Sequence, residues 1–352
     1  MDMLQELTGL SHEFGANSYV KGGGGNTSAK TEDTLWIKPS GTTLAKIKST
    51  DFVPLERKMI RDMLGSEISN EAGKREEIVK NAMAASVRKG YSGRPSVEAP
   101  LHELLAGKYV VHTHPEVVNG MTCSVRGREI CARLFPDAMW VPYIDPGYTL
   151  CSQMKQHLSD FKAASKRDAS VIFLENHGIF VSADTADQVR LLMQDIISKL
   201  NAEYLKSGLS LEQQKTKAGG LVEETALIQS LLPGHASHVA SVSGFEVPEG
   251  PLTPDHIVYS KSWPYRGALT KAGLDEYKAK HGYYPQVVVT KSGVYGLGAS
   301  QTKASLALEL AMDGSAVQRY ASAFGGVQYM TDRAAKFIEN WEVESYRQAQ
   351  VA

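Results

Sequence analysis

Cysteine, excess charge of one sign and long apolar segments are all scarce in this sequence. Its 352 residues hold three cysteines, Cys123, Cys131 and Cys151, in no paired spacing, which argues against a disulfide framework and fits a reducing compartment. The formal net charge is -1, so electrostatics gives no reason to expect nucleic acid or an anionic membrane as a partner. The N-terminus has no basic and apolar signal region, and no apolar run reaches transmembrane length. We therefore expect a cytoplasmic protein.

The composition is that of an ordinary globular chain, with 42% hydrophobic and 22% charged residues. The length favours two domains, or one large domain with an appendage. Proline and glycine punctuate residues 232–254, which we interpret as a linker. After it a strand, a glycine-rich turn, a second strand and a helix echo the pattern of residues 170–200; a degenerate repeat and a chance similarity are both open. We place the domain boundaries at 1–235 and 236–352.

A histidine pair provides the first chemical signal. A short β-branched and aromatic run ends in His112-Thr-His114. Alternate side chains of a strand point to one face, so both imidazoles would aim at one point, as two ligands of one metal ion do. Packed or surface histidines give the same pattern. His177 lies in a tight turn between two apolar runs, where it is held rigidly and can complete a three-histidine site.

A second signal is the run Lys21-Gly-Gly-Gly-Gly-Asn26-Thr27-Ser28. We interpret it as a loop whose backbone N–H groups form an anion nest, with the amide and hydroxyls as further donors. It is neither a Walker A motif nor the dinucleotide-binding fingerprint. A flexible surface loop is the alternative.

Two more short polar clusters follow. Ser40 and Gly41 lie in a turn after an expected strand, and Ser96 and Glu98 lie at an expected helix start. A plain capped turn and a helix-dipole partner are the simpler interpretations of these two clusters.

Taken in order, Gly-Gly-Asn-Thr-Ser, Lys-Pro-Ser-Gly, Pro-Ser-x-Glu, His-Thr-His-Pro and Glu-Asn-His-Gly resemble the motifs of the class II aldolase/adducin family. That family includes the fuculose-phosphate and rhamnulose-phosphate aldolases and ribulose-phosphate 4-epimerase. The resemblance covers roughly residues 1–230. Residues 250–352 look like the C-terminal extension of longer members, in which a rhamnulose-1-phosphate aldolase part is fused to a short-chain dehydrogenase. No dehydrogenase domain follows here, so the sequence resembles the aldolase part alone.

The resemblance implies an α/β fold, with three α/β/α layers around a mostly antiparallel central sheet and a C-terminal α/β extension. It also implies one divalent metal ion per subunit, usually Zn²⁺, although Mn²⁺ and Co²⁺ suit the same ligands. The implied ligands are His112, His114 and His177. Glu98 matches the catalytic acid/base, which can also ligate the metal.

The same resemblance implies a phosphate-binding set. Val97 stands where many members have a second serine before the acid. The loss of that hydroxyl leaves room for a substrate without phosphate. The matched residues are Asn26, Thr27, Ser28, Ser40, Gly41 and Ser96.

The implied reaction is the retro-aldol cleavage of a ketose 1-phosphate, such as one similar to rhamnulose 1-phosphate, or of a related sugar acid or ketose. Tyr143 and Tyr148 are the candidates for handling the proton at the aldehyde oxygen. We expect burial to raise the proton affinity of Glu98 when the carboxylate leaves the metal.

Other activities and partners are also implied. A sugar-phosphate 4-epimerase, a decarboxylase and a dehydratase occur on the same fold, although the epimerases tend to have aspartate where this chain has Glu98. A non-catalytic interaction module like the adducin head, which lacks the metal site, is the alternative of a different class. We expect a small sugar or sugar phosphate as partner, no nucleic acid and no membrane, and a homotetramer with sites at subunit interfaces.

Overall fold

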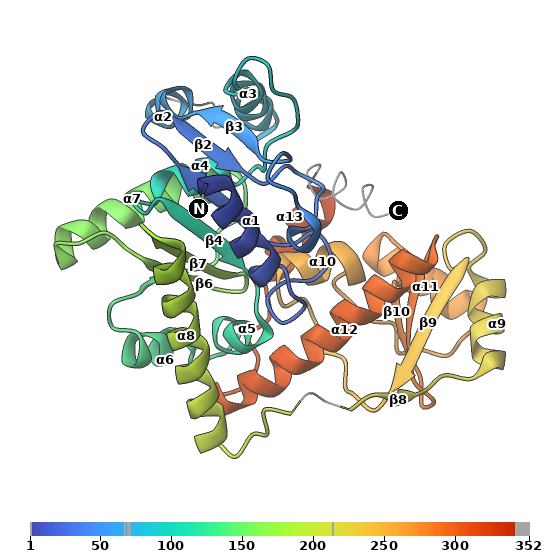
Figure 1. Cartoon of the computed structure of the whole chain (residues 1–352). Helices are drawn as coiled ribbons and strands as arrows, with labels where there is room; N and C mark the ends of the chain where they lie inside the picture. Colours follow the sequence, from blue (N-terminus) through green and yellow to red (C-terminus); the bar gives the residue numbers. More distant parts are fainter. Residues whose placement is uncertain (1, 67, 69–71, 213–214, 342–352) are drawn as a thin grey trace. The chain divides into compact units, whose positions relative to one another are not determined.

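The computed structural model describes residues 2–66, 68, 72–212 and 215–341 (Figure 1). Contacts divide the chain into unit 1, Met1–Val118 with Arg128–Leu200, and unit 2, Asn119–Gly127 with Asn201–Ala352. Residues 201–235, which we assigned to the aldolase-like domain, thus belong to unit 2. The functional boundary at residue 235 stays a prediction, and the end of the predicted extension, 342–352, lies outside the described residues.

Unit 1 is built on a seven-stranded sheet with the order β3-β2-β1-β4-β7-β6-β5. Every neighbouring pair is antiparallel except β5 with β6, so the sheet is mostly antiparallel, as expected. The strands are β1 (Asn26–Lys30), β2 (Thr34–Ile37), β3 (Val53–Glu56), β4 (Tyr109–Thr113), β5 (Met139–Val141), β6 (Val171–Leu174) and β7 (Gly178–Ala183).

Helices cover both faces of this sheet. On one face a large apolar core joins the strands to four helices, and among its members are Leu35, Val110, Ile60, Met83, Leu101 and Met154. On the other face lies α1, which contacts β1 and β4 and is joined to α8 by the Arg190–Glu13 ion pair. The three α/β/α layers are therefore confirmed. The helices are α1 (Met3–Phe14), α2 (Arg57–Gly65), α3 (Ala72–Ala85), α4 (Ala99–Leu104), α7 (Tyr148–Ser165) and α8 (Ala186–Lys206), and the connections hold η1 (Leu44–Lys46), α5 (Glu116–Thr122) and α6 (Gly127–Leu134).

Strand β1 corrects our interpretation of residues 26–28 as a loop. All five of its residues are buried, and it lies between β2 and β4. The strand is polar, but both of its faces find buried partners. Thr27 Oγ1 lies 2.6 Å from Ser11 Oγ of α1, and Ser28 Oγ lies 2.7 Å from His102 Nδ1 of α4. Because these hydroxyls are hydrogen-bonded, their burial costs little.

Unit 2 has a four-stranded sheet, in the order β10-β11-β9-β8, on which the long helix α12 packs. The expected strand–turn–strand–helix order is confirmed, since β10, β11 and α12 follow the same order as β6, β7 and α8, and both helices have 21 residues. The expected linker is wrong in part, because it contains β9, whose side chains are only partly buried. The elements are β8 (Lys217–Ala218), α9 (Val222–Leu231), β9 (His238–Ser243), α10 (Pro254–Ser260), α11 (Lys271–His281), β10 (Val287–Val289), β11 (Val294–Gly298), α12 (Gln301–Ala321), η2 (Ser322–Phe324) and α13 (Asp332–Asn340).

Among the described residues, no helix combines the length and the apolar character that a bilayer-spanning segment needs. The cytoplasmic location stays a prediction.

Candidate metal centre

Three imidazoles meet in unit 1, and all belong to histidines singled out from the sequence. One ligand nitrogen each from His112, His114 and His177 lies within 4.8 Å of the others. The Nε2 atoms of His112 and His114 are 3.0 Å apart. A tetrahedral zinc ion with Zn–N bonds of about 2.0–2.1 Å holds its nitrogen ligands roughly 3.3 Å apart. The donor set therefore suits a divalent cation of this kind, and the His112–His114 spacing is close to that of two bound ligands.

His112 is the most firmly held of the three. It lies in β4, paired with Asn26 of β1 on one side and with Phe180 of β7 on the other, and it is fully buried. Its Nδ1 is 3.0 Å from the carbonyl oxygen of Ile179, so Nδ1–H donates there and Nε2 stays available for a ligand bond. The ring also stacks on Phe180, with centroids 4.0 Å apart and planes at 11°.

The other two histidines lie in connections, and local backbone geometry brings them close. His114 follows the end of β4, and His177 lies in the turn between β6 and β7. Asn176 turns the chain there with a left-handed φ of 51°. At Gly178 a Cβ atom would lie 2.5 Å from His114 Cδ2, so only glycine lets this ring approach the turn.

Glu98 stands at the start of α4 with its carboxylate facing the histidines. Its Oε1 lies 3.4 Å from His112 Nε2, and its Oε2 accepts a hydrogen bond from Asn26 Nδ2. Burial alone would raise the pKa of the Glu98 carboxyl, but the imidazoles of His112, His177 and His114 outweigh burial and hold that pKa well below its usual range. Burial acts in the direction that we expected, and the rise in proton affinity when the carboxylate leaves the metal stays a prediction. In this arrangement Glu98 is an anion.

Four of the expected phosphate-binding residues gather near Glu98 or on the turn beside it. Asn26 contacts Glu98 directly, and Ser96 Oγ accepts from the Glu98 backbone N–H at 3.2 Å. A bridge between Pro39 and Pro95 holds the turn with Ser40 and Gly41 against the segment before Glu98. Val97, at the position of the missing second serine, is partly buried.

Thr27 and Ser28 are placed differently. Both are fully buried, and their hydroxyls contact Ser11 and His102. Their role in phosphate binding stays a prediction, and the structure gives their hydroxyls other partners.

The two tyrosine candidates lie in the segment after β5. Glu175 N donates to Val141 O at 3.0 Å, which joins the start of this segment to the turn that carries His177. Tyr148 begins α7 and packs against the unit 1 core, and burial raises the pKa of its phenol. A proton-transfer role for Tyr143 or Tyr148 stays a prediction.

Sequence reasoning missed residues that support this centre, above all His102 and Lys30. His102 lies one helical turn after Glu98, a spacing that marks a shared helix face. It is fully buried, and burial lowers the pKa of its imidazole to about 3, so the ring is neutral. The backbone contact of His112 with Ile179 could be found only from the strand register.

Comparison with known proteins identifies the family of this chain. A sequence profile described as "Class II Aldolase and Adducin N-terminal domain" matches residues 5–197, and the chain belongs to this family.

One relative is the uncharacterized oxidoreductase YuxG of Bacillus subtilis (strain 168), which is 24% identical over 98% of this chain; the chain spans 58% of that protein. Among solved structures, the N-terminal class II aldolase domain of a conserved protein from Thermoplasma acidophilum is 24% identical, with a TM-score of 0.49 over 57% of this chain and 93% of that one. The L-fuculose-1-phosphate aldolase from Thermus thermophilus is 14% identical, with a TM-score of 0.37 over 59% of this chain and 98% of that one.

Proposed function

We propose that this protein is a metal-dependent aldehyde-lyase that cleaves a ketose 1-phosphate or a related sugar by retro-aldol chemistry. One observation carries the proposal. The ligand nitrogens of His112, His114 and His177 lie within 4.8 Å of one another, and the Glu98 carboxylate is 3.4 Å from His112. A non-catalytic, adducin-like interaction module, which lacks the metal site, would not need such a cluster.

The three histidines would hold the cation, Zn²⁺ by the family resemblance, with Mn²⁺ and Co²⁺ as chemically suitable substitutes. When bound, the cation supplies Lewis-acid polarisation of a substrate carbonyl. Glu98 is the acid/base, because its Oε1 faces the histidines while Asn26 holds Oε2. In the cleavage direction the hydroxyl that becomes the aldehyde gives up its proton, which would reach the anionic Glu98 through Tyr143 or Tyr148; the electron pair of the broken C–C bond stays on the carbonyl-bearing fragment, and Glu98 then delivers that same proton to its carbon.

The amide of Asn26 supports a hydroxylated substrate. Its Nδ2 donates to Glu98, and its Oδ1 is buried with no hydrogen-bond donor among the described residues. A buried carbonyl oxygen is an acceptor that a sugar hydroxyl would satisfy. Ser40, Gly41 and Ser96 would bind the phosphate, and Tyr143 or Tyr148 would handle the proton of the hydroxyl that becomes the aldehyde.

The test is a substrate screen on metal-replete protein, with its metal content measured by mass spectrometry. Ketose 1-phosphates and their non-phosphorylated counterparts are incubated with the protein and with His112→Ala, and the released aldehyde is trapped as a hydrazone. Metal-dependent aldehyde release supports the lyase. A changed ketose without net aldehyde would indicate the epimerase, and released CO₂ the decarboxylase. Protein with far less than one metal ion per chain and no turnover would favour the adducin-like module.

A further inference from the structure

One face of β1 follows helix α4 along its length. Asn26 Nδ2 donates to Glu98 Oε2 where the helix starts, and two residues later Ser28 Oγ lies 2.7 Å from His102 Nδ1. Two residues of a strand span about 6.8 Å, and four residues of a helix span about 6 Å. Alternate residues of the strand therefore lie beside successive turns of the helix, and each of these strand residues contacts one turn.

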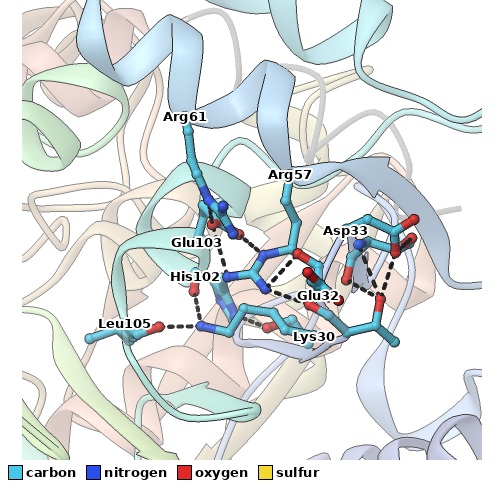
Figure 2. Close-up of polar contacts among 11 residues, drawn as sticks. Lys30, Glu32, Asp33, Arg57, Arg61, His102, Glu103 and Leu105 are labelled. Carbon is cyan, nitrogen blue, oxygen red and sulfur yellow. Dashed lines mark hydrogen bonds and ion pairs between the residues drawn. The ribbon is translucent and has the colours of Figure 1, made fainter.

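Lys30, two residues further along β1, holds the other end of α4. Its Nζ donates to the carbonyl oxygens of His102, at 2.9 Å, and Leu105. The last carbonyls of a helix have no partner inside the helix, so Lys30 supplies what they lack. Figure 2 shows Lys30 between these carbonyls, with two arginines of α2 converging on the neighbouring Glu103.

His102 connects strand β1 and helix α4 to the candidate metal centre through two contacts. Its backbone N–H donates to Glu98 O at 3.1 Å, in the first turn of the helix. Its ring meets Phe180 edge-to-face, with centroids 5.5 Å apart, and the Phe180 ring is the one on which His112 stacks. His102 therefore contacts the helix start at Glu98 through its backbone and, through its ring, the phenyl ring on which His112 stacks.

We propose that His102 is a positioning residue of the metal centre, which, held by Ser28 and Lys30, fixes the separation between Glu98 and His112. The inference rests on the proposed function in so far as that function places a cation at the histidines. Ser28, which the family resemblance assigned to phosphate, acts here through His102. A reactive site needs its groups held within about 0.5 Å, and a neutral, fully buried ring with fixed neighbours can do that.

The test is Co²⁺ titration of the full-length protein, followed by visible absorption, which reports the ligand geometry without any substrate. Ser28→Ala removes the hydrogen bond to His102 and keeps the ring. His102→Asn keeps a hydrogen-bonding atom near Ser28 and removes the ring from Phe180. The matched control is Ser11→Ala, because Ser11 is equally buried and pairs with β1 on its opposite face, through Thr27.

We expect Ser28→Ala and His102→Asn to weaken Co²⁺ binding roughly tenfold to a hundredfold and to change the absorption spectrum. Ser11→Ala should lower the melting temperature by about as much as Ser28→Ala does, but it should leave the Co²⁺ affinity and the absorption spectrum unchanged. If Ser28→Ala binds Co²⁺ with the affinity and spectrum of the wild type, His102 is only a core residue and the inference is overturned; this variant decides even if His102→Asn does not fold. A wild-type protein that binds no Co²⁺ would instead overturn the proposed function, and the inference with it.

Discussion

Replacing Lys30 by methionine should change how the stability of the protein depends on pH. Lys30 is 5% exposed, and burial, partly offset by the charge of Glu103, lowers the pKa of its amine from 10.5 to about 8. The folded protein therefore gives up this proton near pH 8, whereas the unfolded chain keeps it until about pH 10.5. Between these values the unfolded state binds more protons, so the free energy of unfolding rises with pH.

A difference of about 2.5 pKa units corresponds to about 3 kcal/mol at most, since each unit is worth about 1.4 kcal/mol. Urea unfolding of the wild type and of Lys30→Met would be compared at pH 7, 8, 9 and 10. Groups present in both proteins cancel in the difference between the two unfolding free energies. The free energy of unfolding of the wild type should rise relative to that of Lys30→Met by about 2–3 kcal/mol from pH 7 to pH 10.

The neighbouring carboxylate provides an internal control for this experiment. Glu103 raises the pKa of Lys30, so in a Glu103→Gln background the rise should begin at a lower pH. A difference between wild type and Lys30→Met that stays flat within about 0.5 kcal/mol over the whole range would refute the reasoning, because a buried amine with a lowered pKa cannot give a flat curve.

Three other changes probe the centre and its support. His112→Ala should lose the metal and the activity together, while Glu98→Gln should keep the metal and lose roughly 10²–10⁴-fold in turnover; metal analysis and aldehyde release measure both, and a Glu98→Gln rate near that of the wild type would contradict the assigned role. Gly178→Ala places a Cβ 2.5 Å from His114 Cδ2 and should weaken Co²⁺ binding at least about tenfold; unchanged affinity would show that the ring has room to move. Glu103→Gln leaves two arginines without their carboxylate and should cost about 3 kcal/mol in urea unfolding, and a loss below about 1 kcal/mol would mean that solvent replaces the pair.

The cluster of three histidines could be predicted from the sequence because strand alternation relates His112 to His114, and two apolar runs mark the turn at His177. The helix start at Glu98 and the long helix after residue 184 were equally visible, since apolar periodicity and capping patterns are local. Family motifs then related these segments to one another, which no local pattern does.

Strand β1 could not be predicted in this way. Three of its five residues, Asn26, Ala29 and Lys30, are of types that are scarce in strands, and the segment follows four glycines. The segment forms a central strand because α1 and α4, distant in sequence, supply hydrogen-bond partners on its two faces. The same lack of long-range information hid the role of His102, whose ring matters through Phe180 of another strand.

The three histidines belong to elements of different rigidity, and this has a consequence for amide hydrogen exchange. His112 belongs to a strand bonded on both sides, whereas His114 and His177 belong to two separate connections. A cation bound by the three histidines would therefore form a removable cross-link between these connections. When a chelator removes the cation, amide exchange along β4 should stay slow, because Val111 and His112 are hydrogen-bonded within the sheet. Exchange at His177 and Gly178 should become faster, because their turn can unfold locally.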